Sequence, residues 1–128
     1  MTPGEINVIS GQVVTAAMRV HSALGPGLLE SAYQACLVHE LRRRGLHVAT
    51  QVELPVFYEG MRVEVGYRLD ILVQDAVIVE LKASSKVLPV HEAQLLSYMK
   101  LRNHRIGLLI NFHVPHLKDG IKRFVNNL

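Results

Sequence analysis

The chain has 128 residues, of which 49% are hydrophobic and 20% charged, and 14 Lys and Arg residues against 11 Asp and Glu residues give a formal net charge of +3. These values exclude a disordered chain and fit one domain with a real core. No apolar run approaches the ~18 residues that cross a bilayer, and no secretory signal opens the sequence. We therefore expect a single domain over residues 1–128 that works in the cytoplasm without a membrane partner.

Two helices are predicted in the first third of the chain. Apolar residues recur at three- and four-residue steps over residues 6–24 and again over 28–44, as in amphipathic helices. The Gly-Pro-Gly turn at 25–27 separates them, because glycine relaxes φ and proline disfavours the helical region for the preceding residue. His21, close to this turn, either faces a site or interacts with the helix end. Cys36 is expected as a buried thiol.

The middle of the chain is rich in Val, Ile, Tyr and Phe and predicts strands. Residues 52–58 and 61–67 alternate around Glu59-Gly60, which is a hairpin signal. A further strand is predicted over 77–81.

The last third returns to helical spacing over 91–101 and then to a buried strand over 105–112. The tail, 115–128, fits either a helix or a final strand. The order of elements indicates a mixed α/β (α+β) fold.

The most informative stretch lies around the polar residues of two successive strands. If residues 74–76 form the turn between them, antiparallel pairing places Asp70 directly opposite Glu80. Lys82 then shares their face, because side chains alternate along a strand. A two-residue turn would instead send the two carboxylates to opposite faces. The other face is expected to be apolar throughout, with Leu69, Ile71, Val73, Val77, Val79 and Leu81.

Two opposed carboxylates destabilise a sheet unless something neutralises them, and a divalent metal ion does so. Lys82 adds positive charge where a phosphodiester gains negative charge during hydrolysis. The plain alternative is a solvated strand face with a weak ion pair. The apolar residues around Glu80 favour the catalytic interpretation, because an uncompensated buried charge is costly.

At this point the residues resemble a known family. Asp70 followed by Glu80-x-Lys82 resembles the active-site signature of the PD-(D/E)XK nuclease superfamily, with Leu69 in place of the proline. The segment 27–33 (GLLESAY) resembles the motif of the GxxExxY family, a set of small bacterial proteins of that superfamily. The resemblance extends over most of the chain and includes the phrases VHSALGPGLLESAY, GYRLDILV, IVELKA, HEAQLLSYMKL and GLLINF.

The resemblance implies a restriction-endonuclease-like αβββαβ core, with a central mixed sheet flanked by helices and an extra N-terminal helix. It implies that Asp70 and Glu80 bind Mg²⁺ or Mn²⁺, that Glu30 assists, and that Lys82 is the catalytic lysine. All four residues are thus expected to be catalytic.

Further residues are expected to contact the substrate. Gln94 and Tyr98 resemble the Gln-x-x-x-Tyr motif of RecB-like nucleases and lie on one helix face, with His91 one turn earlier. Tyr33 is a further candidate, with core packing as its alternative. Some RecB-like relatives carry an iron–sulfur cluster, which the single cysteine, Cys36, excludes here.

The sequence supports three alternatives for the function. The first is a divalent-metal-dependent nuclease acting on nucleic acid, with DNA favoured over RNA. The second is a catalytically silent module that keeps the fold and binds nucleic acid or protein. The third is a hydrolase of another substrate class, which a fold by itself does not exclude. A homodimer or a protein partner would supply surface that so small a nuclease lacks.

Overall fold

The first two helices form where the apolar periodicity predicts them. In the computed structural model, which describes residues 1–128, they are α1 (Pro3–Leu24) and α2 (Glu30–Arg43). Thr2 caps α1, because its Oγ1 accepts the Glu5 N–H at 3.1 Å while Glu5 Oε1 accepts the Thr2 N–H at 3.1 Å. Cys36 is exposed and not buried as expected, because α2 turns another stripe inward. That stripe consists of Tyr33, Leu37, Val38 and Leu41.

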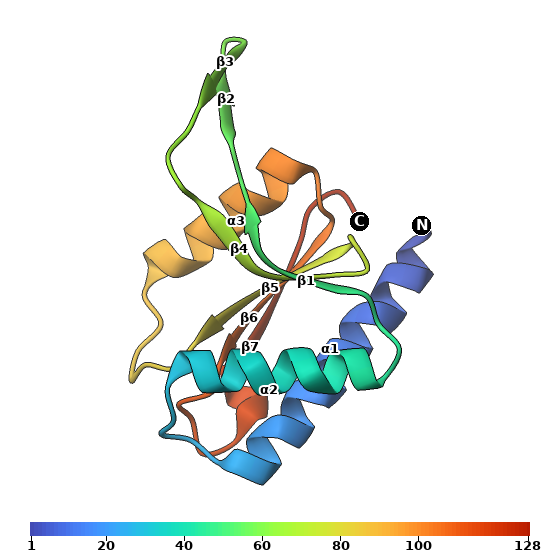
Figure 1. Ribbon diagram of the computed structural model, residues 1–128, viewed down its shortest axis with the longest axis vertical. Helices are drawn as coiled ribbons and strands as arrows, with labels where there is room; N and C mark the ends of the chain where they lie inside the picture. Colours follow the sequence, from blue (N-terminus) through green and yellow to red (C-terminus); the bar gives the residue numbers. More distant parts are fainter.

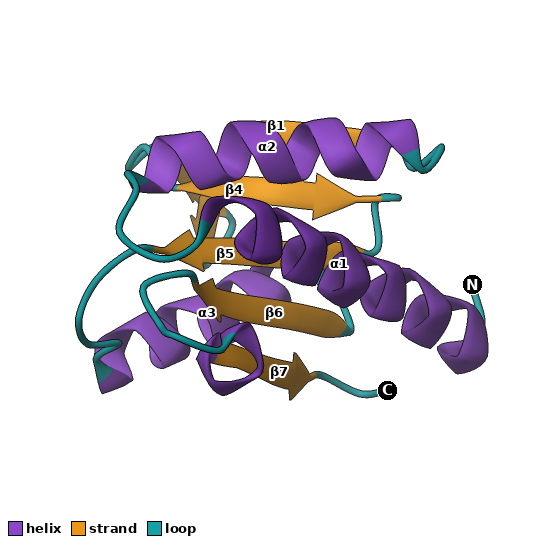
Figure 2. Cartoon of the chain, turned by 90° about the horizontal axis from the view of Figure 1, so that it is seen from below, coloured by secondary structure: helices purple, strands orange, loops and turns teal.

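Five strands form one mixed sheet in the order β1-β4-β5-β6-β7. Only β5 and β6 are parallel, because α3 crosses over between them. Figure 2 shows α1 and α2 on one face of this sheet and α3 on the other. The predicted mixed core with an additional N-terminal helix is therefore confirmed. The elements of the sheet and its crossover are β1 (Val48–Glu53), β4 (Arg68–Val73), β5 (Val77–Lys82), α3 (Pro89–Arg102), β6 (Ile106–Asn111) and β7 (Ile121–Val125).

The tail that the sequence left open contains both a turn and a strand. A short 3-10 helix, η1 (Leu117–Gly120), leads into β7, which pairs antiparallel with β6. No helix of the fold combines the length and the apolar character that crossing a bilayer requires.

The predicted hairpin forms, but it is shorter than expected and stands away from the sheet. Strands β2 (Val56–Tyr58) and β3 (Met61–Val63) pair around Glu59-Gly60 and project from the body as an arm (Figure 1). Residues 52–58 do not form one strand, because Leu54 is buried and its N–H donates to the Tyr67 carbonyl at 2.9 Å. The chain before Leu54 instead pairs with β4 as β1.

The core has two layers, one on each face of the sheet. The larger cluster lies under α1 and α2, and the smaller one lies under α3. Leu69 belongs to the smaller cluster and not, as expected, to the face of Ile71. The reason is a local interruption, because Asp70 and Gln51 form no ladder pair and Gln51 has a φ of 50°. The side-chain alternation of β4 therefore changes at Asp70.

Candidate active site

The turn between β4 and β5 has the length that brings the two acids together. Val73 is the partner of Val77, and the Ala76 N–H donates to the Val73 carbonyl at 3.0 Å. Gln74 and Asp75 have φ values of 54° and 48°, the left-handed pair typical of tight hairpin turns. The three-residue turn over 74–76 is thus confirmed.

The backbone ladder between β4 and β5 ends one pair before the acids, and their side chains take its place. The last ladder partners are Ile71 and Val79. Beyond them, the Asp70 N–H donates to Glu80 Oε1 at 3.2 Å, and the Leu81 N–H donates to Asp70 Oδ2 at 3.0 Å. Each carboxylate is therefore held by the opposite strand through one of its oxygens. The other oxygen of each carboxylate accepts no backbone hydrogen bond.

Glu80 lies in an unfavourable electrostatic environment. Only 9% of the residue is exposed. Burial, followed by the negative charge of Asp70, raises the pKa of Glu80 to about 8, and Lys82 only partly opposes this. Glu80 therefore stays protonated up to about pH 8, and a fully ionised pair would carry more negative charge than Lys82 offsets.

Glu30 interacts electrostatically with the same group of charged residues. It is the first residue of α2, and its pKa is raised by burial and by Asp70 and lowered by Lys82. Glu30, Asp70 and Lys82 therefore lie within electrostatic range of one another. The structure brings all four expected catalytic residues to one end of the β4–β5 pair.

Tyr33 explains how the turn before Glu30 is held. Its hydroxyl donates to the Gly25 carbonyl and accepts the Leu28 N–H at 3.1 Å, while its ring stacks on Phe112 with centroids 4.4 Å apart. Tyr33 is fully buried and has no surface for a substrate. The expected substrate contact is therefore replaced by a structural role, which is to fix the turn that leads to Glu30.

The helix α3 places an aromatic residue beside the acids. The pKa of Tyr98 is raised by burial, by Glu80, by Tyr67 and by Asp70, and the rings of Tyr67 and Tyr98 are 5.9 Å apart. Both tyrosines and the exposed Gln94 line a hollow of about 300 Å³. Gln94 and Tyr98 thus share one surface next to the acidic pair.

His91 does not line that hollow. Its Nδ1 accepts the Leu88 N–H at 3.1 Å, so this nitrogen closes the first turn of α3. The role expected for His91 in substrate contact therefore rests on its other ring nitrogen alone.

Two residues that support the site were missed by the sequence analysis. Tyr67 pairs with Tyr98 at the start of β4. Asn111, the neighbour of Lys82 across the sheet, accepts the Ser84 N–H at 3.3 Å and donates to the Ser84 carbonyl at 2.9 Å. A lone polar residue at the end of the apolar run RIGLLINF was the available signal for Asn111.

The donor set of the site suits a hard divalent cation. Mg²⁺ is usually bound by one or two carboxylates, with water and substrate phosphate completing the shell. Asp70 and Glu80 supply two carboxylates with one free oxygen each. No three Asp, Glu, His or Cys side chains converge to enclose an ion by themselves. The residues present therefore fit an open site for Mg²⁺ or a similar divalent cation.

Comparison with known families agrees with this geometry. A family model described as the PD-(D/E)XK nuclease superfamily matches residues 7–124. The chain therefore belongs to the PD-(D/E)XK nuclease superfamily. Membership implies a nucleic-acid substrate, and nucleases of this superfamily generally use divalent metal ions such as Mg²⁺. No curated protein and no solved structure gives a significant match to the chain.

Proposed function

We propose that this protein is a divalent-metal-dependent nuclease that hydrolyses phosphodiester bonds of nucleic acid. One observation carries the proposal: Glu80 is buried against Asp70, with Lys82 as the only cation that acts on it. A fold gains no stability from such an arrangement, because opposed like charges are unfavourable. A site that receives an external cation explains why the arrangement exists.

Asp70 and Glu80 would hold Mg²⁺ or Mn²⁺ through their free oxygens, and Glu30 would assist from the start of α2. Such an ion supplies Lewis acidity and an activated water molecule when it is bound. The protein's own contribution is preorganisation, because the Asp70 and Leu81 amides fix both carboxylates before a substrate arrives.

Lys82 would act on the phosphate and on the attacking water. It follows Glu80 by two positions on β5, and its charge acts on both Glu30 and Glu80. An ammonium group at this position stabilises negative charge that develops on the phosphate oxygens and orients a water molecule by hydrogen bonding.

The hollow beside the acids would accept a nucleotide next to the cleaved bond. Tyr67 and Tyr98 offer ring surface for stacking, and Gln94 offers an amide for hydrogen bonding. With Gln94 and Tyr98 in these roles, the protein fits the RecB-like group, and the motif around Glu30 fits the GxxExxY family. We further propose that the substrate is DNA and that the protein works in the cytoplasm.

We also propose that a partner chain or a second copy of this chain contacts the β2–β3 arm. Phe57, Tyr58 and Met61 on this arm are 60%, 64% and 59% exposed. A two-stranded hairpin is only marginally stable alone. A partner that covers these side chains would stabilise the arm and extend the surface near the site.

The decisive experiment measures cleavage of labelled single- and double-stranded DNA and RNA with Mg²⁺ or Mn²⁺. We expect Asp70→Asn and Lys82→Ala to lower the cleavage rate by about 10²-fold or more, since each removes preorganised charge from the reacting phosphate. Thermal unfolding should show that both variants remain folded.

Matched controls come from the same strands and the following loop. Asp75→Asn makes the same change at the opposite end of β4–β5, and Lys86→Ala removes an exposed lysine four positions after Lys82. Both controls should cleave like the wild type. Unchanged cleavage in Asp70→Asn and Lys82→Ala would refute the proposal. Wild-type protein that binds neither metal ion in a calorimetric titration would support the silent binding module instead.

A further inference from the structure

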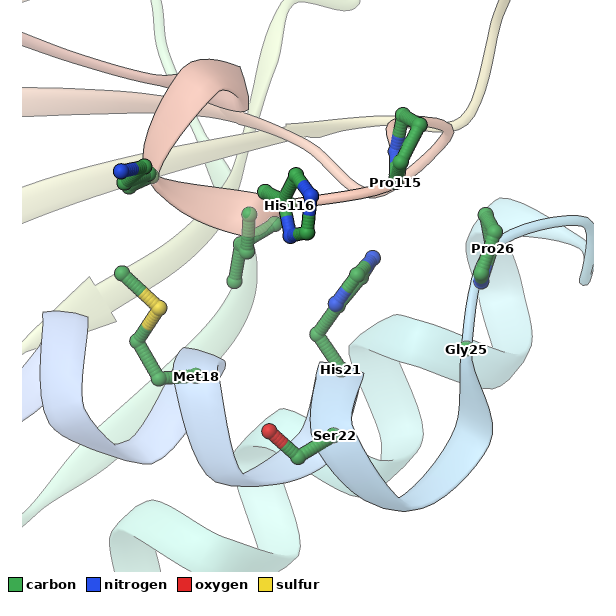
Figure 3. Close-up of a pocket in the computed structure, with 9 residues that line it drawn as sticks. Met18, His21, Ser22, Gly25, Pro26, Pro115 and His116 are labelled. Atoms are coloured by element: carbon green, nitrogen blue, oxygen red, sulfur yellow. The ribbon is translucent and has the colours of Figure 1, made fainter.

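A second polar cavity lies outside the acidic site, between the end of α1 and the loop that follows β6. Its volume is about 470 Å³, and its polar side chains are those of His21, Ser22, His116 and Lys118. Figure 3 shows His21, from α1, and His116, from the loop, facing each other across this cavity. We call it the His21–His116 pocket.

The lining of this pocket is basic and contains no acid. Two histidines and one lysine contribute to it, with a serine hydroxyl and no Asp or Glu. The nearest acid along the chain, Asp119, lines a different hollow together with Glu92 and Lys122. A cavity with donors and positive charge but no carboxylate favours an anion.

The walls of the pocket are fixed by buried contacts. His21 is only 7% exposed, and its Nε2 donates to the Val114 carbonyl at 2.8 Å, which ties α1 to the loop. Phe112 lies beneath, with its ring centroid 6.3 Å from that of His21 and stacked on Tyr33. Tyr33 in turn bonds to Gly25, which also lines the pocket. His21 is thus a positioning residue, and the cavity is preformed.

The pocket lies at the same end of the sheet as the acidic site. Lys82 and Asn111 are partners across β5 and β6, and the Phe112 N–H donates to the Lys82 carbonyl at 2.9 Å. The loop that carries His116 therefore starts beside Lys82. On the other wall, the turn that begins at Gly25 leads directly to Glu30. The loop and the turn that line the pocket are therefore continuous with the elements that carry Lys82 and Glu30.

We propose that the His21–His116 pocket binds a backbone phosphate of the nucleic-acid strand, at a position other than the bond that is cleaved. This inference rests on the proposed nuclease function. The acidic site repels a polyanion, so a nucleic-acid strand that crosses it needs a positively charged contact elsewhere. His116, Lys118 and the hydroxyl of Ser22 supply this contact without sequence selectivity, because phosphate contacts position a strand and do not read its bases.

The first test measures binding of a short fluorescein-labelled single strand by anisotropy at several salt concentrations. The wild-type protein is used in EDTA, so cleavage does not interfere. His116→Gln with Lys118→Gln should weaken binding several-fold and reduce the slope of log K against log salt by about 1. The matched control, His39→Gln with Lys100→Gln, makes the same changes on exposed surfaces of α2 and α3 and should leave both quantities unchanged.

The second test does not depend on nuclease activity. Inorganic phosphate is titrated into the ¹⁵N-labelled protein, and the amide signals of Ser22, His116 and Lys118 should shift in the wild type. In the His116→Gln, Lys118→Gln variant the shifts of Ser22 should be lost. A mononucleotide and the strand are then compared at the same amides.

The outcomes separate this inference from the nuclease proposal. Wild-type strand affinity and salt slope in the His116→Gln, Lys118→Gln variant would overturn the pocket while leaving the nuclease intact. The pocket proposal would also be overturned if phosphate and the mononucleotide shift these amide signals but the strand does not, because the pocket would then bind only free phosphate groups. Unchanged cleavage in Asp70→Asn would refute the nuclease proposal. Strand-induced shifts of the Ser22 amide signal would in that case still support the pocket proposal.

Discussion

The two ends of the β4–β5 pair handle carboxylates in opposite ways. At the turn, Asp75 is 78% exposed and lies near two basic side chains, Arg102 at 3.7 Å and His104 at 3.6 Å, although burial and the charge of Arg102 lower the pKa of His104. At the other end, Glu80 is buried and faces Asp70, with only Lys82 to offset them. The same two strands therefore carry one compensated acid and one uncompensated acidic pair.

This difference separates a carboxylate that the fold compensates from a pair of carboxylates that it does not compensate. An exposed ion pair costs little and contributes little, so it needs no further explanation. Burial and the charge of Asp70 raise the pKa of Glu80 to about 8, which lowers the stability of the free protein as the pH rises, and the cation proposed above would relieve this conflict. Burial and partner count distinguish the two ends better than residue type does.

The largest effect is expected for Glu80→Gln in metal-free protein. Folded Glu80 stays protonated up to about pH 8, whereas the unfolded chain ionises near pH 4.5, so wild-type stability falls as the pH rises through this window. The amide introduced by this substitution would have no proton to lose, and its oxygen would still accept the Asp70 N–H. The variant should therefore gain on the order of a few kcal/mol over the wild type by pH 8, measured by urea unfolding across pH.

Glu92→Gln provides the control for this comparison, because Glu92 pairs with Lys122 at 2.6 Å on the surface of the protein. Its stability difference from the wild type should not grow towards pH 8. Parallel pH profiles for Glu80→Gln and the wild type would show that Glu80 is not strained by burial.

A smaller effect is expected from metal binding. Mg²⁺ or Mn²⁺ at about 100 times its dissociation constant should stabilise the wild type by about 2.7 kcal/mol, seen as a higher melting temperature. The gain should be greater above pH 8 than near pH 6, because the ion and the proton compete for Glu80. Asp70→Asn and Glu80→Gln should show little gain. An equal gain in these variants would place the ion elsewhere.

The smallest effect is expected at the turn. Asp75→Asn removes the ion pair with Arg102 and the contact with His104, and it should cost about 0–1 kcal/mol, less at high salt. Asparagine tolerates the left-handed φ of 48° at this position, so no backbone strain is added. Urea unfolding measures the cost, and a loss of several kcal/mol would contradict the view that this end is only weakly coupled.

Local patterns predicted most elements of the fold. Apolar periodicity predicted α1, α2 and α3, the Gly-Pro-Gly turn at 25–27 predicted where α1 ends, and Glu59-Gly60 predicted the turn of the hairpin. The prediction for Leu69 was wrong because strand alternation assumes an unbroken pleat, and the interruption at Gln51 and Asp70 depends on how two distant strands meet. Cys36 was misplaced because a helix has several faces, and packing against α1 decides which one is buried.

The sequence by itself limited the register of β4 against β5 to the choice between a three-residue and a two-residue turn, and the three-residue turn places Asp70 opposite Glu80. A turn of fixed length sets which residues of a hairpin are opposite each other, so this information is local. The tertiary structure alone decided that the turn has three residues, that Tyr33 packs under the turn before Glu30, and that His21 and His116 share a pocket. The shared pocket joins residues far apart along the chain, and only the packing of helices on the sheet brings such residues together.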